Sequence, residues 1–199
     1  MNGTSRPLDH LLLSLIVVMV VIGFFIFSSA SLGLMARGGV PIQSVASSQL
    51  LFGIIGGSIA LFITSSIHYR HWRQYAFYIF LGAVLLTLAV FVPGLGMTHA
   101  GATRWLDLGI TTVQPAEFLK LGYIIYLATW LSRFTNKLNN FTYGLLPFAV
   151  ITGLVGITLL LQPDTDTFLI TAAAGGAMYI VAGAPWRDLL IIGVSGIAL

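Results

Sequence analysis

The sequence carries very little charge and no cysteine. Only 8% of its 199 residues are Asp, Glu, Lys or Arg, which excludes an ordinary soluble domain, because such a domain has about 25% charged residues. The absence of cysteine excludes disulfides, thiolate metal sites and a cysteine nucleophile. The net charge of +3 does not indicate nucleic-acid binding, because the basic residues are scattered between apolar runs instead of forming one block.

Hydrophobic residues make up 57% of the chain, with 13 Phe and 22 Gly. This composition predicts an all-α, multi-pass bundle of membrane-spanning helices in which glycines allow close helix packing. Windows of about 20 apolar residues place six complete spans at 11–31, 49–67, 75–93, 114–131, 143–161 and 167–184. A seventh begins near Arg187, and the 13 residues to Leu199 would cover about 20 Å of a roughly 30 Å hydrocarbon core. We therefore expect a single membrane domain, 1–199, truncated inside a helix.

The basic residues of the connecting segments predict the orientation. If every predicted span crosses, one side of the membrane receives Arg6, Arg70, Arg73, Arg133, Lys137 and Arg187, and the other receives Arg37 and Arg104. Because cytoplasmic loops are enriched in Lys and Arg, the N-terminus is predicted to be cytoplasmic. The loops at 101–112 and 162–167 then face outward.

The chain has nine basic and six acidic residues, and four of these charged residues lie in the stretch from Gly101 to Lys120. Pro115 suits the first position of a helix, Gln114 would precede it as the cap, and Glu117 would lie in the first turn. Glu117 and Lys120 are three residues apart and can form an ion pair on one helix face. The pair either braces the helix or contacts an anionic headgroup, and ionisable residues inside a membrane favour a functional role.

Two further polar groups are predicted on the same side. Arg104 could bind a phosphate through bidentate hydrogen bonds or remain solvated, and Trp105 beside it suits an interfacial anchor. Asp164 is a candidate partner for Arg104 or Lys120. Asp164 and Asp166 have the spacing with which sugar-nucleotide enzymes bind a divalent cation, but the nucleotide-binding fold of those enzymes is absent here. No metal site or cofactor is predicted, and a divalent cation stays an open alternative.

Three ordered motifs carry a resemblance to a known family. They are Arg104–Leu106, Gln114–Leu121 and Gln162–Asp164, which contain Trp105, Pro115 and Pro163. Together they resemble the SEDS (shape, elongation, division and sporulation) proteins of the FtsW, RodA and SpoVE group, and Ser28–Ser31 resembles the cell-division branch. The resemblance implies a fold of about ten helices in the bacterial plasma membrane, of which this chain covers the N-terminal half. It also implies a peptidoglycan glycosyltransferase that polymerises lipid II for the division septum, with a class B penicillin-binding protein transpeptidase and other division proteins as partners.

The resemblance also predicts what each site residue does. Arg104, Glu117, Lys120 and Asp164 would bind the substrate, with Arg104 and Lys120 facing the departing pyrophosphate. The family's essential acidic residue, a proposed catalytic base, falls in an outer loop beyond Leu199, so we expect the 199 residues alone to be inactive. Asp166 stands where the family usually has glycine. A lipid II flippase and a non-catalytic scaffold of the division machinery are the alternatives.

Overall fold

The computed structural model describes residues 9–35, 53–99, 101–107, 109 and 112–197. The chain is mostly helical, at 77%. It divides into two compact units, Met1–Ile67 and His68–Leu199.

The first unit contains α1 (His10–Met35) and α3 (Gly56–Ser66). Asp9 precedes α1 and its carboxylate accepts a hydrogen bond from the Leu12 amide at 3.0 Å, which satisfies one of the amides left unpaired at a helix start. Both helices expose large apolar side chains, and no residue of α3 is buried. The predicted spans at 11–31 and 49–67 coincide with these helices, although residues 49–52 lie outside the described residues.

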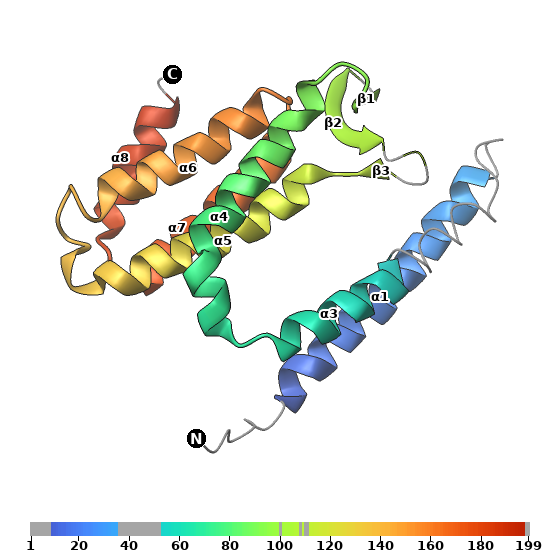
Figure 1. Cartoon of the computed structure of the whole chain (residues 1–199), viewed down its shortest axis with the longest axis horizontal. Helices are drawn as coiled ribbons and strands as arrows, with labels where there is room; N and C mark the ends of the chain where they lie inside the picture. Colours follow the sequence, from blue (N-terminus) through green and yellow to red (C-terminus); the bar gives the residue numbers. More distant parts are fainter. Residues whose placement is uncertain (1–8, 36–52, 100, 108, 110–111, 198–199) are drawn as a thin grey trace. The chain divides into compact units, whose positions relative to one another are not determined.

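The second unit is a helical bundle with a small sheet at one end (Figure 1). Its helices are α4 (Tyr69–Leu88), η2 (Ala89–Phe91), α5 (Pro115–Phe134), η3 (Thr135–Lys137), α6 (Leu145–Leu160), α7 (Thr165–Val181) and α8 (Trp186–Ile197). Helix α4 packs along α5, α6 packs against α7, and α5 contacts both α6 and α7. These helices match the remaining predicted segments to within a few residues, except that α4 begins six residues before the predicted start.

The centre of this bundle is the place where α5, α6 and α7 meet. Tyr123 of α5 is fully buried and its hydroxyl lies 2.9 Å from the Thr152 hydroxyl of α6. Gly175 of α7 faces the same ring, and a Cβ at that position would lie 1.8 Å from the Tyr123 hydroxyl oxygen. A glycine is therefore needed at position 175, because any side chain there would overlap the Tyr123 ring.

The segment between α4 and α5 forms a three-stranded antiparallel sheet, which the prediction of an all-α chain missed. The strands are β1 (Gly96–His99), β2 (Ala102–Asp107) and β3 (Thr112–Val113), in the order β1-β2-β3. Gly101, with φ of +82°, provides the left-handed residue that the turn between β1 and β2 needs. These strands are too short to give a strong alternating signal beside long apolar helices, so the sequence indicated only a loop here.

Two of the described helices are both long and apolar enough to cross a membrane, at His10–Ala30 and Tyr69–Phe91. The segments Gly53–Ser66, Leu145–Leu160 and Thr165–Val181 are shorter apolar helices. Helix α5 has 20 residues and carries three charged residues, Glu117, Lys120 and Arg133. Two of these charges, Glu117 and Lys120, lie in the first two turns of the helix.

Candidate functional site

Arg104 is the central residue of a polar cluster at the end of the bundle that carries the sheet. It lies on β2, and its guanidinium group contacts the turn between α6 and α7. The Nε atom donates to the Gln162 carbonyl at 3.3 Å, Nη1 lies 3.4 Å from Asp164 Oδ1, and Nη2 donates to the Pro163 carbonyl. Because a guanidinium group has five N–H donors, this arrangement leaves two of them for other acceptors. Of the two partners predicted for Asp164, Arg104 and Lys120, the structure shows the pairing with Arg104.

Two side chains extend this cluster to the ends of α4 and α5. Gln114 directly precedes α5, and its Nε2 donates to Asp164 Oδ2 at 3.3 Å. Gln162 donates from Nε2 to the Thr87 carbonyl of α4 at 2.7 Å. We call Arg104, Gln114, Gln162, Pro163 and Asp164 the Arg104 clamp, because together they join β2, the start of α5, the end of α4 and the α6–α7 turn.

The charges of the clamp are balanced within a mostly buried environment. Asp164 is 1% exposed, so its carboxylate depends on Arg104 and Gln114 in place of water. The Arg104 side chain is 31% exposed, and this leaves its outer edge open to the surroundings. Asp164 stands at the N-cap of α7 but makes no side-chain cap hydrogen bond, since its oxygens are directed to the clamp. Gln162 is fully buried and its Oε1 has no hydrogen-bond partner among the described residues.

Glu117 and Lys120 form the predicted ion pair, with 2.8 Å between Lys120 Nζ and Glu117 Oε1. Pro115 occupies the first turn of α5 and Gln114 the N-cap position, as predicted, although the Gln114 side chain makes no cap hydrogen bond. The Lys120 side chain is 26% exposed and that of Glu117 is 57% exposed. Among the residues that the structure describes, no hydrogen bond or ion pair joins Lys120 to the Arg104 clamp. The two groups are therefore separate parts of one polar end of the bundle.

The remaining sequence candidates lie outside these contacts. Trp105 is 38% exposed on β2, a position that suits an interfacial anchor. Asp166 is exposed in the first turn of α7, where the helix dipole favours an anion. Within the described ranges, no three His, Cys, Asp or Glu side chains are grouped closely enough to hold a metal ion.

Two polar contacts between helices, one buried and one partly buried, escaped the sequence prediction. One is the contact between the Tyr123 and Thr152 hydroxyls described above. The other joins α7 to α8, where the Tyr179 hydroxyl donates to Asp188 Oδ2 at 2.8 Å. Tyrosine and threonine inside apolar segments give little signal for a specific partner, because either can equally face lipid headgroups or its own helix backbone.

The chain is similar to proteins of bacterial cell-wall synthesis. It is 34% identical over 200 residues to a probable peptidoglycan glycosyltransferase FtsW of Halothiobacillus neapolitanus, covering 98% of this chain and 48% of that protein. A protein of the same name from Saccharophagus degradans is 30% identical over 196 residues, covering 97% and 50% of the two chains. The chain thus spans about half the length of the curated relatives it matches.

Solved structures agree with these relatives. The crystal structure of the rod shape determining protein RodA of Thermus thermophilus superposes with a TM-score of 0.75 at 28% identity, covering all of this chain and 60% of that one. A chain of a peptidoglycan synthase complex that coordinates polymerization and crosslinking superposes with a TM-score of 0.73, also at 28% identity, over 96% of this chain and 52% of its own. The chain therefore has the fold of part of a RodA-like membrane protein. The model of the FtsW, RodA and SpoVE family of cell cycle proteins matches residues 9–199, and the chain belongs to this family.

Proposed function

We propose that this chain carries the part of a lipid II-polymerising peptidoglycan glycosyltransferase that binds the anionic, pyrophosphate portion of the lipid-linked substrate. The observation that supports this role is a partly exposed lysine, Lys120, in the second turn of α5, at the same end of the bundle as the Arg104 clamp, whose guanidinium group keeps two donors for other acceptors. Positive charge at this place suits a pyrophosphate leaving group, whose negative charge increases as the glycosidic bond forms. The names of the relatives are consistent with this reaction.

The residues divide into two roles in this proposal. Lys120 and the outer edge of Arg104 contact the pyrophosphate, and Glu117 orients the Lys120 side chain when the site is empty. Asp164 is too buried to touch a substrate, so it acts by fixing the guanidinium plane of Arg104. None of these residues serves as the general base for the attacking hydroxyl, and the proposal assigns them binding only.

The topology that accompanies this function places the chain in the bacterial plasma membrane. In this proposal the six predicted spans cross the membrane with the N-terminus in the cytoplasm, so the Arg104 clamp and the Glu117–Lys120 pair lie at the outer surface. Lipid II is polymerised on that side. By analogy with the complex whose chain has the same fold, the proposed partner is a class B penicillin-binding protein transpeptidase.

The binding role is tested with the purified chain in detergent and fluorescent lipid II. We expect Lys120→Ala to weaken lipid II binding by about 10- to 150-fold, because a hydrogen bond to a charged group contributes about 1.5–3 kcal/mol. Arg73→Gln is the matched control, since it removes one exposed positive charge near the start of α4. Equal affinities for Lys120→Ala, Arg73→Gln and the unchanged chain would contradict the proposed site.

The reaction itself is tested in a chimaera in which residues 1–199 replace the aligned half of the Halothiobacillus relative. We expect the chimaera to make glycan strands from lipid II, and Lys120→Ala to abolish them. A folded chimaera that translocates the lipid II headgroup across liposomes but makes no polymer would contradict the glycosyltransferase proposal in favour of a flippase. A folded chimaera with neither activity that still binds the transpeptidase would favour a scaffold.

A further inference from the structure

A second charged cluster lies at the opposite end of α5 from Lys120. The Phe134 and Tyr143 rings stack with their centroids 5.5 Å apart. Arg133 Cζ lies 5.7 Å from the centre of the Phe134 ring, and Lys137 Nζ lies 5.0 Å from that of Tyr143. Trp130 also packs on Phe134 and donates from Nε1 to the Tyr143 carbonyl at 3.1 Å. Two cations are thus held on one aromatic cluster at the junction of α5, η3 and the loop before α6.

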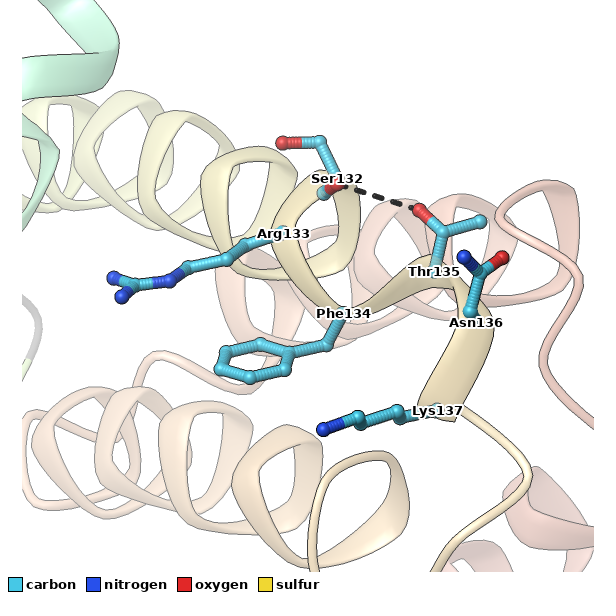
Figure 2. Close-up of a pocket in the computed structure, with 6 residues that line it drawn as sticks. All are labelled: Ser132, Arg133, Phe134, Thr135, Asn136 and Lys137. Carbon is cyan, nitrogen blue, oxygen red and sulfur yellow. Dashed lines mark hydrogen bonds between the residues drawn. The ribbon is translucent and has the colours of Figure 1, made fainter.

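This cluster borders a surface cavity of about 280 Å³ that is lined by residues 132–137. Figure 2 shows that the Arg133 and Lys137 side chains extend in the same direction as the Phe134 ring, which lies between them in that view. The side chains of Thr135 and Asn136 do not extend in that direction and instead extend toward the top of the same view. The cationic groups therefore belong to the same side of the cavity wall.

Neither cation has a partner of opposite charge among the residues that the structure describes. Within the described part of the chain, Arg133 and Lys137 form no ion pair, and their side chains donate no hydrogen bond. Three carboxylates have other partners, with Asp164 bound by Arg104, Glu117 by Lys120 and Asp188 by Tyr179. Contact with a ring face compensates part of a positive charge but occupies none of the N–H donors. Up to eight donors are thus free for an anion with several oxygen atoms.

The surroundings indicate which anion this is. Trp130 and Tyr143 are amphipathic, and Phe141 is 62% exposed close by in the sequence. Aromatic residues of this kind collect at the depth of the lipid headgroups. Arginine binds phosphate through paired hydrogen bonds, and basic pockets between spanning helices bind anionic headgroups. A zwitterionic headgroup suits the cavity less, because its own ammonium group would be repelled by Arg133 and Lys137.

We propose that Arg133 and Lys137, held on the Phe134–Tyr143 stack, form a binding site for the phosphate of an anionic phospholipid such as phosphatidylglycerol. The bound lipid would fix the turn between α5 and α6 at the membrane surface. This site is at the other end of α5 from the proposed substrate site, so its failure would leave the glycosyltransferase proposal unchanged.

The full chain, purified in detergent, is titrated with phosphatidylglycerol or phosphatidylcholine, and bound lipid is counted by native mass spectrometry. We expect preferential binding of phosphatidylglycerol, and an affinity about thirtyfold lower in the Arg133→Gln/Lys137→Gln variant, equivalent to about 2 kcal/mol for two basic residues near an anionic headgroup. The matched control is Arg70→Gln/Arg73→Gln, which removes the same charge from exposed positions at the start of α4. We expect this control to bind phosphatidylglycerol like the unchanged chain.

Three results would overturn the proposal. Equal binding of the two lipids would show that the cavity does not select an anionic headgroup. An equal loss in the control variant would show general attraction by positive charge and no defined site. Displacement of phosphatidylglycerol by millimolar inorganic phosphate would assign the cavity to a free anion. Arg133→Lys keeps the charge but not the paired donors, so its affinity for phosphatidylglycerol should lie between those of the unchanged chain and the double variant.

Discussion

Replacement of Gly175 by alanine should destabilise the bundle, because the new methyl group would overlap Tyr123. The Cβ would lie 1.8 Å from the hydroxyl oxygen and 2.7 Å from Cζ of that residue, so the ring must move. Overpacking of this kind costs about 1–3 kcal/mol, and movement of the ring also breaks its contact with Thr152, worth about 1 kcal/mol. Because alanine has a higher helix propensity than glycine, it stabilises the helix by up to about 1 kcal/mol and offsets part of this loss. The net loss of unfolding free energy should be about 2 kcal/mol.

Thermal unfolding in a mild detergent measures this effect. For a chain of this size, about 2 kcal/mol corresponds to a Tm lower by about 4–8 °C. Gly153→Ala in α6 is the matched control, because nothing lies within 4 Å of a Cβ there, and its Tm should be unchanged or slightly higher. Tyr123→Phe removes the closest atom and should make Gly175→Ala less costly in the double variant. Equal Tm values for the two alanine variants would refute the close contact between α5 and α7.

Three further predictions concern the polar contacts. Arg104→Gln should lower the unfolding free energy by about 1–3 kcal/mol, because Gln114 would remain as the side-chain hydrogen-bond partner of the buried Asp164 carboxylate. Amide hydrogen exchange should then become faster at residues 162–168. Unchanged exchange there would contradict the clamp. Tyr179→Phe should lower the unfolding free energy by about 1 kcal/mol and make amide hydrogen exchange faster at the start of α8. Faster exchange confined to α6 would contradict the Tyr179–Asp188 contact. Glu117→Ala should change stability by less than about 0.5 kcal/mol, because exposed i,i+3 pairs contribute little, and a larger loss in thermal unfolding would make the pair mainly structural.

The helices could be predicted from the sequence because apolar runs of about 20 residues leave few alternatives. The start of α5 was predictable in detail, since Pro115 and the Glu117–Lys120 spacing are local signals. The sequence left Arg104 and Lys120 as alternative partners for Asp164. Sixty positions separate the two residues, and no local rule decides between Arg104 and Lys120 as the partner of a distant carboxylate.

Other features depend on tertiary contacts that periodicity does not report. The sheet at 96–113 consists of strands of four, six and two residues, and it is stabilised by its position beside η2 and the start of α5. The aromatic and basic cluster at Arg133 and Lys137 requires Tyr143 to fold back onto Phe134. Sequence alone places these cations in a loop and indicates only an orientation relative to the membrane.

The Arg104 clamp has a consequence for exchanging segments between members of the family. Two of the three acceptors of the Arg104 guanidinium group are backbone carbonyls, at positions 162 and 163, so Arg104 makes no hydrogen bond to the side chain at position 163. The shape of the α6–α7 turn instead depends on one arginine located 58 positions earlier in the chain. A graft of this turn into a relative should therefore bring the segment from Gly96 to Gln114 with it, because the two segments form one transplantable unit although they are distant in sequence.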